Sequence, residues 1–144
     1  MILVTGDPVD AADAMREFMQ SAGEGAIATF VGTVRGSGGV EELTLDHYPG
    51  FSESQIAALV DGLIDRHQLV AATVIHRFGT MRPGETILFA ATAAPHRRGA
   101  LDALNELVEQ LKIEAPFWKK ERIAGTERWL EPAEPAYLVR QDDT

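Results

Sequence analysis

The chain has 144 residues, 45% of them hydrophobic. This length fits one compact domain, so we expect residues 1–144 to form a single domain with a proline-rich, acidic tail from about residue 131. Aspartate and glutamate number 22 against 13 lysines and arginines, which gives a net charge of −9. Such a charge argues against general affinity for nucleic acid or an anionic membrane, because both require a dominant positive field.

The chain contains no cysteine, which excludes disulfides, thiolate nucleophiles and most zinc sites. Any sulfur chemistry would have to use sulfur that arrives on another molecule. His47, His67, His76 and His96 are spread without metal-binding spacing, so we predict no metal and no cofactor. The sequence has no run of about 18 apolar residues and no basic leader, so it predicts neither a membrane span nor a signal peptide. We therefore expect a cytoplasmic protein.

The first third of the chain predicts a strand, a helix and a second strand. Residues 2–5 form a short apolar run, and a helix is expected over about residues 8–20, with Pro8 in its first turn. Residues 25–35 are β-rich and largely apolar, which is typical of a buried central strand. The small residues 36–39 then predict a flexible loop.

The middle of the chain predicts another strand and a confident amphipathic helix. Residues 43–48 alternate as a strand, and Ser52 with Gln55 matches a capping box at the start of the helix. Apolar residues follow at helical spacing: Ile56, Leu59, Val60, Leu63 and Ile64. Two further strands are expected over residues 70–78 and 86–92, joined by a turn of suitable composition.

The last third predicts a helix followed by two strands. The helix is expected to begin near Pro95 and to end before Pro116, with one face packed on a sheet. The residues of that face are Leu101, Leu104, Leu107, Val108 and Leu111. Strands are expected over residues 117–123 and around 128–130. Because several connections are hairpins, we predict an α+β fold with a mixed, mostly antiparallel sheet and three packed helices.

Positive charge gathers near the end of this acidic chain. Six basic residues lie between residues 96 and 122, namely Arg97, Arg98, Lys112, Lys119, Lys120 and Arg122. A solvated basic face explains such clusters in many proteins. The neighbouring Phe117 and Trp118 favour the alternative, an anion-binding site, because they would anchor the backbone of the segment.

The other basic residues can each be interpreted as ligand-binding or as structural. Arg35 ends an apolar strand, where ligand groups are often presented, although a lone arginine there is more commonly solvated. His96 and Arg97 fall at the start of the third helix, where free N–H groups and the dipole favour an anion. His76 is better explained as a structural histidine with a satisfied hydrogen bond.

One helix separates two of these basic groups. His96 and Lys112 are sixteen residues apart, which corresponds to roughly 24 Å along a helix. A small ligand cannot contact both ends of one copy. If His96, Arg97 and Lys112 serve one site, two subunits must face each other across a two-fold axis, so we expect a homodimer.

Together these segments resemble one known family. The resemblance rests on residues 25–26, 29–35, 45–50, 75–79, 83–85, 95–97 and 115–121, in the same order. The chain is similar to the large, catalytic subunit of molybdopterin synthase from about residue 25 to residue 131. The resemblance implies an α/β hammerhead type of fold and a central homodimer flanked by two small ubiquitin-like subunits, a heterotetramer.

The resemblance also implies the reaction. Members of this family are sulfurtransferases, which add two sulfur atoms to cyclic pyranopterin monophosphate and so form the dithiolene of molybdopterin. The sulfur arrives as a thiocarboxylate at the Gly-Gly C-terminus of the small subunit. The absence of cysteine agrees with an external sulfur donor.

Residue by residue, the resemblance implies a site with two catalytic lysines. Lys112 and Lys119 match these lysines, and Lys120 and Glu121 continue the same segment. Substrate contacts are implied for Arg35 with the backbone of Thr33 and Val34, and for His96 with Arg97 from the other protomer. A second hypothesis stays open, a noncatalytic dimeric scaffold that binds a ubiquitin-like protein or a phosphorylated metabolite.

Overall fold

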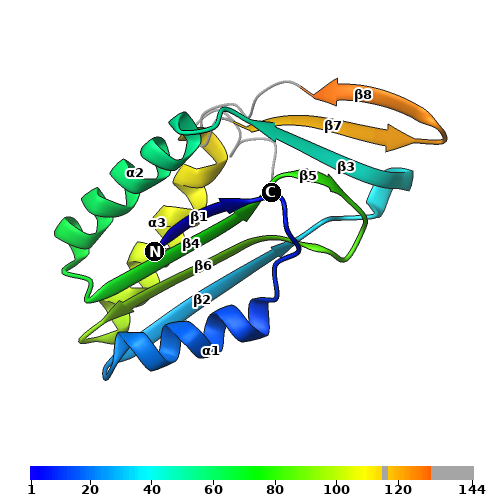
Figure 1. Cartoon of the computed structure of the whole chain (residues 1–144). Helices are drawn as coiled ribbons and strands as arrows, with labels where there is room; N and C mark the ends of the chain where they lie inside the picture. The colour runs from blue at the N-terminus through cyan, green and yellow to red at the C-terminus, as the bar shows by residue number, and fades with distance from the viewer. Residues whose placement is uncertain (115–116, 131–144) are drawn as a thin grey trace.

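The computed structural model describes residues 1–114 and 117–130, which form two four-stranded sheets and three α-helices (Figure 1). The predicted α+β class is confirmed. The acidic tail predicted from about residue 131 lies outside the described residues. The described helices include no candidate membrane span.

The first sheet is mixed and has the strand order β1-β4-β6-β2. Its strands are β1 (Ile2–Thr5), β4 (Ala71–Arg77), β6 (Thr86–Ala94) and β2 (Ala26–Thr33). The pair β1–β4 is parallel, and the other two pairs are antiparallel. The two central strands carry long buried runs, as expected for strands with both faces covered.

Helices cover both faces of this sheet (Figure 1). On one face α2 (Phe51–His67) and α3 (Arg97–Glu114) pack over a large apolar cluster that includes Ile56, Val74 and Leu107. On the other face α1 (Ala11–Ala22) packs over a smaller cluster around Phe18 and Phe89. The sheet therefore forms the middle layer of a three-layer body.

The second sheet is antiparallel and has the strand order β5-β3-β7-β8. Its strands are β5 (Gly79–Met81), β3 (Val40–His47), β7 (Phe117–Ile123) and β8 (Thr126–Leu130). A short 3-10 turn, η1 (Ser37–Gly39), precedes β3 within the predicted glycine loop. A third apolar cluster, with Val34, Leu43, Leu45 and Met81, joins this sheet to the first.

One strand was missed and one was misplaced in the sequence prediction. The strand expected over residues 70–78 is confirmed as β4, but the short strand β5, which follows it in the other sheet, was not predicted. Gly79 has φ +95°, a conformation that favours glycine, and it lets the chain change sheets. The predicted central strand, β2, lies at the edge of the first sheet, where Phe30 and Val31 are partly exposed.

Two predicted helix starts also differ. Helix α1 begins at Ala11 rather than in the Pro8 region, because the Asp10 side chain accepts a hydrogen bond from the Asp13 N–H at 3.1 Å. Helix α2 begins after Gly50, whose N–H donates to the Glu53 carboxylate at 2.6 Å. The predicted capping role of Ser52 was wrong, since its buried hydroxyl accepts from the Tyr48 N–H instead.

Helix α3 packs through smaller residues than predicted. Leu101 is 57% exposed, whereas Ala100 and Ala103 are buried together with Leu107 and Leu111. The Thr92 hydroxyl of β6 donates to the Ala100 carbonyl at 2.7 Å, which brings the helix backbone close to the sheet. This close approach selects alanine on the inner face and turns Leu101 outward.

Candidate active site

Strand β7 directs its two lysines to opposite sides of the second sheet. Lys119 pairs with Leu45 and Lys120 pairs with Thr44 in the β3–β7 register. Because neighbouring residues of a strand alternate between faces, Lys119 shares its face with buried Leu45 and with Phe117. Glu121, two residues after Lys119, belongs to the same face.

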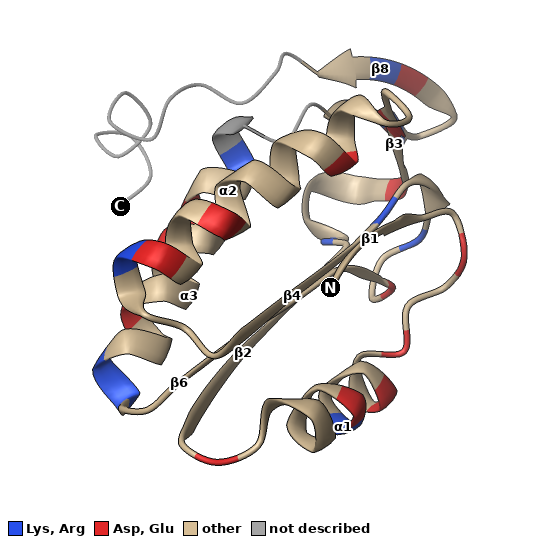
Figure 2. Cartoon of the chain, turned by 60° about the vertical axis from the view of Figure 1, so that its left-hand side comes forward, with Lys and Arg blue, Asp and Glu red and all other residues tan. Residues whose placement is uncertain are grey.

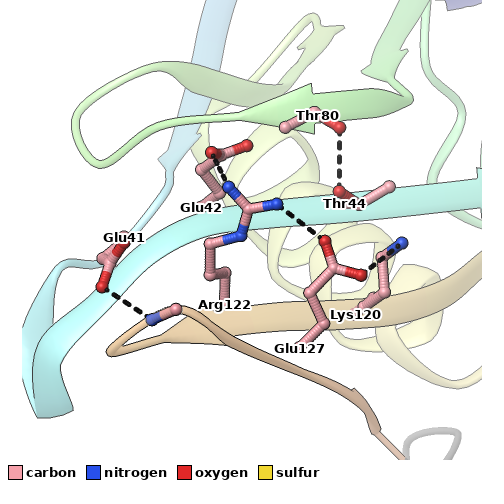
Figure 3. Close-up of polar contacts among 8 residues, drawn as sticks. Glu41, Glu42, Thr44, Thr80, Lys120, Arg122 and Glu127 are labelled. Carbon is pink, nitrogen blue, oxygen red and sulfur yellow. Dashed lines mark hydrogen bonds and ion pairs between the residues drawn. The ribbon is translucent and has the colours of Figure 1, made fainter.

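Lys120 takes part in an ion-pair network on the other face (Figure 3). Its Nζ lies 3.4 Å from Glu127 Oε2 and 5.1 Å from the ring centroid of Trp129. Arg122 bridges the same Glu127 and Glu42, at 2.9 Å each. The hydrogen bond from Arg122, and to a smaller extent the one from Lys120, lowers the pKa of the Glu127 carboxyl. The predicted site residue Lys120 is thus paired with a carboxylate and faces away from Lys119.

Lys112 lies in the last turn of α3, and its side chain is exposed. Its neighbour Leu111 is buried in the large apolar cluster, against which Phe117 also packs. Only residues 115–116 separate α3 from β7. The end of α3, with Lys112, therefore lies beside the start of β7, with Lys119, and both lysines belong to one end of the molecule.

Aromatic rings gather beneath Lys119. The imidazole of His76 stacks on Phe117 with ring centroids 3.9 Å apart and an interplanar angle of 13°. His47 lies 4.2 Å from Phe78 and 6.2 Å from Phe117, measured between centroids. Within the described residues, the buried Nδ1 of His47 has no hydrogen-bond partner. We call His47, His76, Phe78 and Phe117 the aromatic cluster.

The environment of His76 keeps its ring uncharged. Burial lowers the pKa of His76 to about 4, and the nearby charges of Lys119 and His47 act in the same direction. A hydrogen bond with the Arg77 carbonyl, at 3.1 Å, opposes the shift without reversing it. Because a carbonyl only accepts, this bond places the hydrogen on Nδ1 of the neutral ring.

The segment Thr33 to Arg35 reaches the junction of the two sheets. Val34 is buried in the cluster that holds Leu45, the strand partner of Lys119. Its N–H donates to the Glu85 carbonyl and its own carbonyl accepts from Gly84, both at 2.9 Å. The backbone of Val34 is therefore occupied within the chain, whereas the side chains of Thr33 and Arg35 are exposed.

His96 and Arg97 lie at the opposite end of α3 from Lys112. Both side chains are exposed, and Figure 2 shows basic residues at the two ends of this helix. The helix length confirms a separation of roughly 24 Å between His96 and Lys112. Within one chain Lys119, the aromatic cluster and the Val34 segment are neighbours, and Lys112 lies at the same end of the fold, whereas His96 and Arg97 lie at the other end of α3.

Residues 4–114 match the model of the family described as MoaE protein. The chain belongs to the MoaE protein family. It is 44% identical, over 90% of each chain, to a molybdopterin synthase catalytic subunit of Cereibacter sphaeroides. A MoaE protein from Burkholderia ambifaria has a similar structure, with TM-score 0.79, 33% identity, and coverage of 98% of this chain and 97% of that one. Molybdopterin synthase from Staphylococcus aureus gives TM-score 0.78 at 25% identity, covering 90% and 95%.

The small number of lysines in this MoaE-family chain limits which lysines can belong to the candidate site. The sequence holds only three lysines, Lys112, Lys119 and Lys120. Two of them belong to the same end of the fold, and the third is paired on the reverse side of β7. Among the described residues, no group of three or more metal-binding side chains could hold a metal ion.

Sequence reasoning missed the aromatic cluster as part of this site. His76 was interpreted as structural, and its hydrogen bond to the Arg77 carbonyl agrees with that view. The proximity of His76 and His47 to Lys119 depends on contacts between the two sheets. A usable signal was the position of both histidines at the ends of predicted strands, within segments that carry the family resemblance.

Proposed function

We propose that this chain is the catalytic subunit of a molybdopterin synthase. The observation that carries the proposal is 44% identity, over 90% of the chain, to a protein of that name. The pairing of the C-terminal end of α3 with the start of β7, which gathers Lys112 and Lys119, supports it. The chain would thus be an enzyme of molybdopterin biosynthesis.

The proposed reaction is sulfur transfer to cyclic pyranopterin monophosphate. A small ubiquitin-like partner with a Gly-Gly C-terminus would deliver each sulfur as a thiocarboxylate. The thiocarboxylate sulfur attacks a substrate carbon and displaces the oxygen bound there, which leaves as water or as the opened end of the cyclic phosphate. Water then hydrolyses the resulting thioester, so that the sulfur stays on the substrate and the partner leaves as a carboxylate. Two such transfers form the dithiolene. The chain has no cysteine and so no thiol to carry sulfur itself.

Each proposed site residue has a physical role. Lys112 and Lys119 would donate and accept protons during attack and hydrolysis. The exposed Arg35, His96 and Arg97 would bind the phosphate and the polar edge of the pterin by charge-assisted hydrogen bonds. Because both backbone groups of Val34 are occupied, Thr33 and Val34 would act by holding Arg35 in place. Lys120 and Glu121 would contribute less directly than Lys119.

The proposed site is shared between two subunits. In one chain His96 and Arg97 lie at the far end of α3 from Lys112, beyond the reach of one small molecule. A two-fold axis that passes beside the middle of α3, at right angles to it, would place one end of the helix against the other end of its mate. A homodimer would therefore complete two equivalent sites, each flanked by one small subunit in a heterotetramer.

Reconstitution tests the proposal. Purified chain, thiocarboxylated partner and cyclic pyranopterin monophosphate are mixed, and molybdopterin is quantified. We expect Lys112→Ala and Lys119→Ala to lower the rate roughly 10²–10⁴-fold, the usual effect of removing a general acid or base. Arg16→Ala is the matched control, because this exposed arginine lies on α1, across the first sheet from α3.

The outcomes separate the two hypotheses. Turnover by the unchanged chain together with its loss in both folded lysine variants supports the enzyme. Full turnover in both lysine variants would contradict the assigned roles. Binding of the partner and substrate without any turnover by the unchanged chain would favour the noncatalytic scaffold.

A further inference from the structure

The aromatic cluster connects the two sheets beneath Lys119. His76 belongs to β4 of the first sheet, where it pairs with Val4 and Leu88. Phe117 is the first residue of β7 in the second sheet. The stacked pair, with centroids 3.9 Å apart, is therefore a contact between the sheets rather than within one.

We propose that His76 is a positioning residue for Lys119: the ring of His76, stacked on Phe117, fixes the start of β7 and thereby the direction of the Lys119 side chain. This inference rests on the proposed function, in which Lys119 transfers protons.

The strand geometry carries the positional argument. Phe117 and Lys119 are two residues apart in one strand, so their side chains leave the same face. Phe117 packs against both the large cluster beneath α2 and α3 and the cluster between the sheets. A shift of Phe117 would therefore move the base of the Lys119 side chain with it.

Several contacts fix the ring of His76 itself. The residue is 8% exposed, and its Nδ1–H donates to the Arg77 carbonyl. Arg77 in turn donates to Glu85 Oε2 at 2.8 Å, which ties the end of β4 to the turn before β6. His76 is thus held from its own sheet and presents a fixed face to Phe117.

An uncharged His76 is compatible with its position next to the positively charged Lys119. The ionisable groups whose charges act on it among the described residues are Lys119 and His47, and no carboxylate is among them. A second cation beside Lys119 would repel its ammonium and disturb its direction. A buried ring that stays neutral supports the lysine without competing for the anionic substrate.

The three lysines allow a direct test by NMR. The full-length chain is labelled with ¹³C at the lysine ε carbon, which gives three signals, assigned by Lys→Arg variants. His76→Leu removes the stacking ring, and His76→Phe keeps an aromatic ring. We expect the Lys119 signal to move in His76→Leu and to return close to its original position in His76→Phe. The Lys120 signal is the internal control, because Lys120 faces the other side of the sheet.

Steady-state kinetics of the same variants give a second test of the positioning role of His76. In the reconstituted reaction we expect His76→Leu to lower kcat roughly 10–100-fold, the effect of a misplaced catalytic group, with a much smaller change in KM. His76→Phe should restore most of kcat. If His76→Leu does not fold, Phe117→Leu removes the other ring of the stack and should displace the same Lys119 signal.

An unchanged Lys119 signal in a folded variant that lacks the stack would overturn the inference. Loss of kcat in both His76→Leu and His76→Phe, with the Lys119 signal unmoved, would also overturn it. If the unchanged chain produces no molybdopterin, the proposed function fails. The NMR comparison still decides whether His76 positions Lys119.

Discussion

Substituting His76 should change how the stability of the protein depends on pH. Burial lowers the pKa of His76 to about 4 in the folded chain, whereas the unfolded chain has the ordinary value near 6.5. Between these values the unfolded state binds more protons than the folded state. The free energy of unfolding therefore falls as the pH drops below about 6.5.

The magnitude follows from the two pKa values. Between pH 7 and pH 5, protonation of His76 in the unfolded state alone removes about 2 kcal/mol of stability. His76→Phe keeps a ring that can stack on Phe117 but cannot bind a proton. The variant should therefore lose about 2 kcal/mol less than the unchanged chain over this interval.

Urea unfolding at pH 7 and pH 5 measures the difference directly. Other groups titrate in the same interval, so the comparison is between the two pH dependences rather than the absolute values. His96→Gln is the control, because it removes an exposed histidine at the start of α3. Identical losses of stability in His76→Phe and the unchanged chain would refute the buried, neutral state of His76.

Three further substitutions test other contacts. Lys120→Ala should lower the reconstituted rate less than tenfold while Lys119→Ala lowers it 100-fold or more, because Lys120 is paired with Glu127 on the reverse face; equal losses would contradict this difference. Gly25→Ala should lower the free energy of unfolding in urea by about 1–3 kcal/mol, since the new Cβ would lie 2.5 Å from a backbone oxygen at φ +121°; no loss would mean that the backbone relaxes. Glu106→Gln should cost about 0.5–1 kcal/mol by the same measurement, because it weakens the contacts of this partly exposed carboxylate with Arg66 and His67 at the C-terminal end of α2; an increase in stability would contradict this expectation.

The sequence predicted most elements because their periodicity is local. The apolar positions of α2 and the alternation of β3 are read correctly from neighbouring residues. The apolar run of β2 suggested a central strand, but its position at an edge depends on the pairing of strands far apart in the chain. The short strand β5 was not predicted, because the chain changes sheets at Gly79, whose positive φ is not visible in the hydrophobic pattern.

The site was predictable in part. Clustered cations and the family resemblance indicated Lys112 and Lys119 as candidate site residues, and the fold places both at one end of the molecule. The sequence could not separate the roles of adjacent Lys119 and Lys120, because their opposite directions follow from the register with β3. The stack of His76 on Phe117 could not be predicted from the sequence either, because these two rings come into contact only when the two sheets pack together.

Mixing two variants, each expected to lose activity because it lacks one residue of the proposed site, tests the shared site most directly. Lys119→Ala and Arg97→Ala homodimers are purified separately, unfolded, mixed in equal amounts and refolded. Random pairing makes about half of the dimers mixed, and each mixed dimer has one intact site of two, so about a quarter of the original activity should return. If mixed dimers form and no activity returns, Lys119 and Arg97 act from the same chain, and the account of a site built across the two-fold axis is wrong.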